Sequence, residues 1–216
     1  MASGPIRGAG GRYRYPPAGT GISTDPETAR LTALTEAIER YASMAPPGDP
    51  LVRAPFDQLS EMAISLRRFS LHSSDQHRQW ERLRPADDST PVDWCWAFSL
   101  TTGRGVLVPA ALVHFKVAGR PPNDFVAELT STGTACHTSF PAAVLAGLCE
   151  VIERDAVMVA WANDLQLRPL DLDDTPLAEL MAGPLSEEGL TFSVLDVPTE
   201  SPFPVVLAVA WGTGDL

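Results

Sequence analysis

Apolar residues recur at helical spacing in the stretch that follows Asp25. The apolar side chains that share one face of this predicted helix are Leu31, Leu34, Ile38 and Tyr41. The polar side chains across from them include Thr32, Glu36, Glu39 and Arg40. Asp25 is suited to cap the helix, Pro26 is suited to its first turn, and residues 46–48 (PPG) are expected to end it. The pattern therefore predicts an amphipathic helix.

A second helix is predicted downstream, and its pattern is different. Residues 141–149 (PAAVLAGLC) carry no charge, and residues 156–162 (AVMVAWA) are again apolar. The charged side chains of this helix are confined to residues 150–155, between the two runs. Because a helix that is apolar on most sides is expected to be buried, charges held within it need counter-charges or a ligand.

The same charged pattern, E-x-x-E-R, occurs in both predicted helices, as residues 36–40 and residues 150–154. Positions i, i+3 and i+4 share a helix face, so each copy presents two carboxylates beside one guanidinium. Decoration of a solvated helix is the alternative interpretation. If the two copies face each other, carboxylates outnumber guanidiniums, which suits a divalent cation or a cation that carries a polyphosphate. The candidate metal ligands are Glu36, Glu39, Glu150 and Glu153.

Between and after the helices the pattern changes to that of strands. Residues 94, 96 and 98 are aromatic and alternate with smaller residues, and residues 100–105 (LTTGRG) lead into the apolar run 106–109, which predicts a β-hairpin. Residues 111–117 continue as a strand or a short helix. Residues 177–181 (LAELM) predict a further amphipathic helix, followed by strands at 192–197 and 205–211. Together these elements predict an α/β (α+β) fold class.

Two turns rich in glycine or hydroxyl side chains precede the two helices. Gly19-Thr20-Gly21 lies before the first, where a G-x-G pair allows close approach of a phosphate, although an ordinary turn is the alternative. Residues 130–139 (TSTGTACHTS) lie before the second and suit anion binding at a helix N-terminus. The alternative there is plain capping by Ser139, and His137 is either a base or phosphate contact or a structural histidine.

Composition narrows the function classes. The chain has 216 residues, of which 44% are apolar, enough for a core. A formal charge of −11 argues against binding to nucleic acid or acidic lipid. Cys95, Cys136 and Cys149 imply neither a disulfide framework nor a zinc site, and the chain shows neither a membrane-spanning run nor a secretion signal, so we expect a cytoplasmic protein with no membrane or nucleic-acid partner. Residues 1–18 are expected to be a flexible leader.

Several of these motifs, in their order along the chain, resemble those of the YcaO family of ATP-using enzymes that modify peptide backbones. Residues 29–41 (ARLTALTEAIERY) are similar to its first nucleotide motif, S-x-x-x-E-x-x-E-R, with threonine in place of the serine. Residues 91–113 resemble its tryptophan strand and hairpin, and residues 131–157 resemble its second motif, a small-residue turn followed by an E-x-x-E-R-D-A helix. The resemblance implies a YcaO-like fold, with a mixed sheet flanked by helices, over residues 19–216. It also implies a partial domain with an incomplete C-terminal portion.

The resemblance further implies that ATP and Mg2+ are the cofactors and lie between the two helices. Carried over by position, the four glutamates named above match the ligands of magnesium that bridges the phosphates. The nucleotide-binding positions are Gly19, Thr20, Gly21, Thr32, Arg40, Thr138 and Arg154. Thr20, Thr132 and Ala142 depart from the lysine, asparagine and frequent glutamate of the family pattern. No catalytic residue is assigned, because phosphoryl transfer depends on positioning and charge neutralisation rather than on a protein nucleophile.

The implied function is ATP-dependent cyclodehydration of a ribosomally made precursor peptide, which forms an azoline at Cys, Ser or Thr, as in bacteriocin and thiopeptide biosynthesis. The implied partners are that peptide, a leader-peptide-binding protein, a flavin dehydrogenase and, as an open alternative, a second copy of the chain. Two other functions stay open. One is a catalytically incomplete scaffold or binding subunit, and the other is an accessory protein of thioamidation or methylthiolation.

Overall fold

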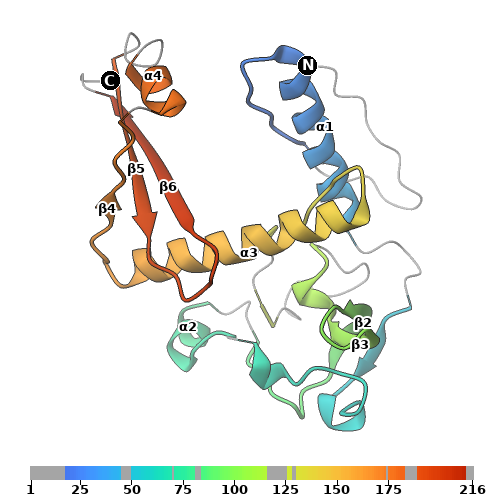
Figure 1. Ribbon diagram of the computed structural model, residues 1–216. Helices are drawn as coiled ribbons and strands as arrows, with labels where there is room; N and C mark the ends of the chain where they lie inside the picture. The colour runs from blue at the N-terminus through green and yellow to red at the C-terminus, as the bar shows by residue number, and fades with distance from the viewer. Residues whose placement is uncertain are drawn as a thin grey trace. The chain divides into compact units, whose positions relative to one another are not determined.

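The computed structural model describes residues 18–44, 50–69, 71–80, 84–115, 126–127, 130–173, 175–182 and 189–212. By its internal contacts the chain divides into two compact units, residues 1–137 and residues 138–216, which we describe separately (Figure 1). The predicted leader at 1–18 lies outside the described residues except for its last residue, and so does the expected helix stop at 46–48.

The first unit begins with helix α1 (Pro26–Ala42), whose start follows the sequence prediction. The Asp25 carboxylate caps the helix by accepting hydrogen bonds from the Thr28 amide at 2.8 Å and the Thr28 hydroxyl at 2.6 Å. The apolar face of α1 is largely exposed. The side chains of that face are 41–54% exposed, and no residue of α1 is buried.

A three-stranded antiparallel sheet forms the centre of the first unit. It has the order β1 (Val52–Ala54), β2 (Val92–Ser99), β3 (Arg104–Pro109). The predicted hairpin is β2–β3, which pairs Trp94 with Pro109 at one end and Ser99 with Arg104 at the other. An isolated parallel bridge also joins Leu107 of β3 to Ala63, which lies outside the named strands.

The core of the first unit lies around Trp94, which is fully buried and donates a hydrogen bond from its indole nitrogen to the Ala54 carbonyl at 2.8 Å. Leu66, Val92, Leu107 and Val126 complete the buried cluster. The connecting segments are short helices: η1 (Phe56–Gln58), η2 (Leu66–Arg68), α2 (Ser74–Gln79) and η3 (Ala110–Leu112). For residues 111–117 we left a strand or a short helix open, and η3 shows a short helix at the start of that stretch.

The second unit consists of helix α3 packed against a second three-stranded antiparallel sheet. Helix α3 (Phe140–Ala162) is followed by β4 (Arg168–Pro169), α4 (Pro176–Ala182), β5 (Leu190–Val197) and β6 (Val205–Gly212). The strand order is β4-β5-β6. The C-terminal half of α3 crosses the β5–β6 hairpin, and Ala156, Ala160, Val197 and Val205 form the core there (Figure 1).

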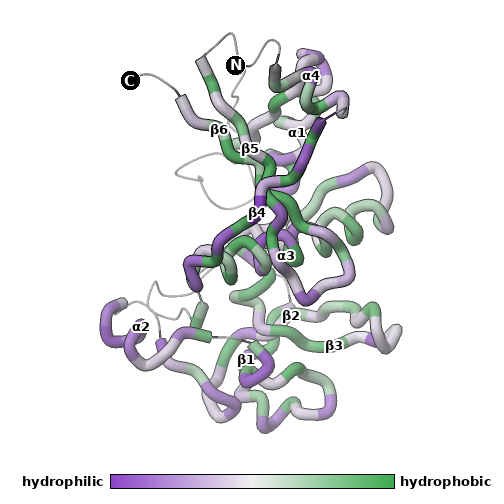
Figure 2. Tube along the Cα trace, turned by 60° about the vertical axis from the view of Figure 1, so that its left-hand side comes forward, coloured by the Kyte–Doolittle hydropathy of each residue, from purple (hydrophilic) through white to green (hydrophobic). Residues whose placement is uncertain are grey.

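Both units combine helices with antiparallel strands, so the predicted α+β class is confirmed. Hydrophobic residues run along α3 and along β2, as their sequence pattern indicated (Figure 2). Helix α3 nevertheless leaves large apolar side chains exposed, including Leu145 and Trp161, where we expected burial. Among the described residues, no helix has both the length and the apolar character needed to cross a membrane.

Candidate functional site

The glycine turn lies directly on helix α1. A Cβ atom on Gly19 would collide with the carbonyl oxygen of Ala33, and one on Gly21 would collide with that of Ala29. Both glycines are therefore required by the close approach of two backbones. The G-x-G pattern, which we interpreted as an approach to phosphate or an ordinary turn, packs against the helix that carries the first E-x-x-E-R motif.

This packing brings Thr20 to the first predicted metal ligand, Glu36. The Oε2 atom of Glu36 accepts hydrogen bonds from the Thr20 amide and, at 2.9 Å, from the Thr20 hydroxyl. The Oε1 atom accepts from Nε of Arg40 at 3.1 Å and from a terminal nitrogen of the same guanidinium. Chiefly the Thr20 amide, and then Arg40, hold the pKa of the Glu36 carboxyl below its ordinary value.

The second glutamate of the motif, Glu39, is held by a residue that the sequence did not assign to the site. The Thr134 hydroxyl donates to Oε1 of Glu39 at 2.6 Å, across 95 positions of the chain. Thr134 lies in the hydroxyl-rich stretch 130–139, but nothing in its pattern distinguished this hydroxyl from its neighbours. Each glutamate of the first E-x-x-E-R motif therefore has a threonine partner from a segment outside the helix.

The other predicted residues of α1 have more ordinary surroundings. Thr32 is exposed, and its hydroxyl donates to the Thr28 carbonyl at 3.0 Å, the usual bond of a threonine to the preceding helical turn. Arg40 is also exposed, and it is engaged with Glu36.

The remaining predicted residues belong to the second unit. On α3, Glu150 is half-buried, whereas Glu153 and Arg154 are exposed. Thr138 is exposed just before the helix, and Ser139 is the N-cap residue but makes no side-chain capping bond. Each helix by itself presents two of the four predicted ligands. Within the described residues, no group of three or more His, Cys, Asp or Glu side chains is gathered at metal-binding distances.

The donor set suits the predicted metal. Mg2+ prefers carboxylate oxygens, and the lowered pKa of Glu36 keeps that side chain in the charged form that a cation requires. The four hydrogen bonds at Glu36 fill the usual acceptor capacity of a carboxylate, so a metal there displaces at least one donor. At Glu39, by contrast, the hydrogen bond within the described residues is confined to Oε1.

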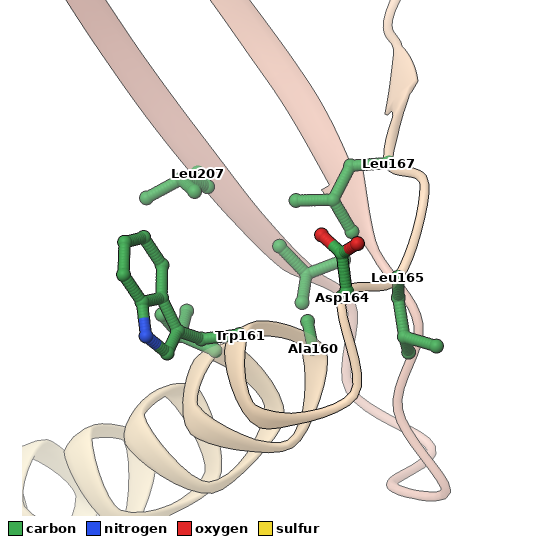
Figure 3. Close-up of a pocket in the computed structure, with 8 residues that line it drawn as sticks. Ala160, Trp161, Asp164, Leu165, Leu167 and Leu207 are labelled. Atoms are coloured by element: carbon green, nitrogen blue, oxygen red, sulfur yellow. The ribbon is translucent and has the colours of Figure 1, made fainter.

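A pocket of about 420 Å³ lies elsewhere, within the second unit, and is mostly apolar. It is lined by Val157, Ala160, Trp161, Asp164, Leu165, Leu167, Val197 and Leu207, none of which is a predicted site residue. Figure 3 shows the Trp161 ring and the Asp164 carboxylate on opposite sides of it. Asp164 follows the end of α3 with a positive φ of 50°, and the amide of Leu165 bonds the Ala160 carbonyl at 3.0 Å, so this region is a Schellman-type helix end.

Comparison with known proteins supports the assignment made from the motifs. The family model described as YcaO cyclodehydratase, ATP- and Mg2+-binding, matches residues 20–216. The chain belongs to the YcaO family. The cofactors expected from the sequence, ATP and Mg2+, are those that the YcaO description names.

Individual proteins are also similar to this chain. The chain is 30% identical over 201 residues to a Rhizobium leguminosarum bv. trifolii protein named as an uncharacterized protein in the tfuA 3′ region, covering 88% of this chain and 44% of that protein. Among solved structures, a heterocyclase in complex with substrate and cofactor is 25% identical with a TM-score of 0.79, over 90% of this chain and 28% of that one. The heterocyclase TruD is 26% identical with a TM-score of 0.76, over 86% and 29%. The chain thus spans less than half the length of each of these three proteins.

Proposed function

We propose that this chain binds ATP and Mg2+ and serves in the reaction of a YcaO cyclodehydratase. The proposed reaction forms an azoline at a Cys, Ser or Thr residue of a ribosomally made precursor peptide. In that reaction the side-chain thiol or hydroxyl would lose its proton and attack the preceding amide carbonyl carbon, and the amide oxygen would accept the γ-phosphoryl group of ATP, which releases ADP. Departure of that oxygen as phosphate, with loss of the amide N–H proton, would then form the C=N bond of the azoline. This proposal is supported by the YcaO match over residues 20–216 and by the two heterocyclases with similar folds.

The observation that carries the proposal is the state of the first E-x-x-E-R motif. Glu36 is ionised and held by Thr20 and Arg40, and Glu39 is held by Thr134. Carboxylates oriented in this way are suited to metal binding, because side chains that are already ordered lose less entropy when they bind.

In the proposed site, Glu36, Glu39, Glu150 and Glu153 would hold Mg2+, which would neutralise phosphate charge during transfer. Arg40 and Arg154 are the cations next to these carboxylates, and Gly19, Thr20, Gly21, Thr32 and Thr138 are the proposed nucleotide contacts. The chain's own task is to bind and position ATP, so no protein nucleophile is required. The proposed partners are the precursor peptide, a leader-peptide-binding protein and a flavin dehydrogenase that would oxidise the azoline.

Titration of the purified chain with ATP, with and without Mg2+, tests this function by calorimetry. We expect ATP binding that depends on Mg2+, and we expect Glu150→Gln to remove that dependence. Glu179→Gln is the matched control, since Glu179 is exposed on α4 and outside the proposed site. A wild-type chain that binds no Mg2+–ATP would overturn the proposal and favour the scaffold or binding-subunit alternative.

A further inference from the structure

We infer that Thr134 is the positioning residue of Glu39, and that its hydroxyl orients this carboxylate for metal binding. The inference deepens the proposed function and rests on it, since it takes Glu39 to be a magnesium ligand. The sequence pattern associated the stretch 130–139 with anion binding at the start of α3. The inference gives one hydroxyl of that stretch, Thr134, a different role, in the first unit.

The turn that carries Thr134 is built to hold this side chain in one place. The Thr134 amide donates to the Ser131 carbonyl at 3.0 Å, which closes a four-residue turn. Gly133, in the third position of the turn, has a φ of 84°, a conformation that glycine adopts without the steric penalty of other residues. The turn therefore fixes the point at which the Thr134 side chain leaves the backbone.

The single proton of this hydroxyl has two acceptors within reach. Oε1 of Glu39 and the Ser131 carbonyl oxygen both lie 2.6 Å from the Thr134 oxygen. A hydrogen bond to a charged acceptor is roughly twice as strong as one to a neutral acceptor, so the proton is directed to the carboxylate. The Ser131 carbonyl then limits the hydroxyl's position rather than competing for its proton.

The consequence for Glu39 is that its two oxygens have different environments. Oε1 is bound to Thr134, and within the described residues the carboxylate has no hydrogen bond at Oε2. Both side chains are half-buried, which reduces competition from water for their bond. Fixing one oxygen orients the other, which is how hydrogen-bonded partners of metal ligands act in general.

The test compares the Mg2+ affinity of the ATP-bound chain among four variants. Thr134→Val removes the hydroxyl with little change of shape, and Thr134→Ser restores it. Glu39→Gln is the reference for loss of the ligand itself. Thr35→Val is the matched control, since it also removes a threonine hydroxyl from the first unit, one that donates to the Thr32 carbonyl of α1 at 2.9 Å and to no carboxylate.

We expect Thr134→Val to weaken Mg2+ binding roughly 10-fold or more, the usual effect of losing a hydrogen-bond partner of a metal ligand. Thr134→Ser should bind Mg2+ close to the wild-type affinity. In Thr134→Val, metal-free ATP binding and the melting temperature should equal those of the control Thr35→Val. A purely structural role of Thr134 would instead lower the melting temperature or weaken metal-free ATP binding.

The outcomes separate this inference from the function on which it rests. If Glu39→Gln weakens Mg2+ binding but Thr134→Val behaves like Thr35→Val, the positioning role is wrong and the metal role of Glu39 survives. If Glu39→Gln binds Mg2+ as the wild type does, Glu39 is not a ligand and both statements are wrong.

Discussion

Gly21→Ala perturbs the candidate site without changing any of its polar side chains. The new Cβ would meet the Ala29 carbonyl oxygen of α1 far inside contact distance, so residues 19–21 must move away by roughly an ångström or more to restore ordinary contacts. A shift of that size lengthens the 2.9 Å bond between the Thr20 hydroxyl and Glu36 beyond hydrogen-bonding range. The Thr20 amide bond to the same carboxylate oxygen is lost with it.

The free energy lost in Gly21→Ala can be estimated from the two hydrogen bonds between Thr20 and Glu36. Hydrogen bonds to charged groups contribute about 1.5–3 kcal/mol each, but this pair is solvent-exposed, so we discount the sum to about 1–2 kcal/mol. That free energy corresponds to a factor of about 5–30 in the local opening equilibrium. The Thr20 amide should therefore exchange its hydrogen about 5–30 times faster in Gly21→Ala than in the wild-type chain.

Hydrogen exchange followed by NMR or mass spectrometry over residues 18–24 measures this change, after correction for the intrinsic rate of the altered sequence. Gly212→Ala is the control substitution, because a Cβ on Gly212 meets nothing within 4 Å. Exchange at Thr20 that is equally slow in Gly21→Ala and in the wild type would refute the close packing of residues 19–21 on α1.

Two further predictions concern charge and core packing. Because folding lowers the pKa of Glu36, its charged form stabilises the chain above the ordinary carboxyl pKa of 4.5, and this contribution is lost as the pH falls through the lowered value. The difference in free energy of unfolding between wild type and Glu36→Gln, from denaturant titrations, should thus be largest near neutral pH and shrink in acid, and a constant difference would contradict it. Trp94→Ala should lower the free energy of unfolding by about 3–5 kcal/mol, because Trp94 is fully buried. Trp96→Ala, at a side chain 57% exposed on the same strand, should change it by only about 0.5 kcal/mol, and equal losses would show that the core is misplaced.

The elements of this fold were predictable where their signals are local. Asp25 and Pro26 determine where α1 begins, and the alternating aromatic residues with the turn at 100–105 determine the β2–β3 hairpin. Burial was less predictable, because it depends on what packs against a face. The apolar face of α1 around Leu34 and Ile38 has the spacing of a buried face, yet both side chains are about half-exposed.

In the candidate site too, the local features were predictable from the sequence and the long-range contacts were not. The two E-x-x-E-R motifs are recognisable in the sequence, since each lies within five consecutive residues. The bond between Glu39 and Thr134 joins positions 95 residues apart, and no local pattern encodes it. The packing of residues 19–21 did have a signal: Ala29, Ala33 and Ala37 form a small-residue stripe along α1, and Gly19 and Gly21 lie against it.

We propose that the carboxylates of the two E-x-x-E-R motifs bind the metal that accompanies ATP. Electron paramagnetic resonance of Mn2+, used in place of Mg2+ with the chain and ATP, reports this binding directly. We predict a protein-bound Mn2+ signal in the wild-type chain that is lost in Glu39→Gln and also in Glu150→Gln, while Glu179→Gln retains it. A bound Mn2+ signal that persists unchanged in both site variants would contradict the claim.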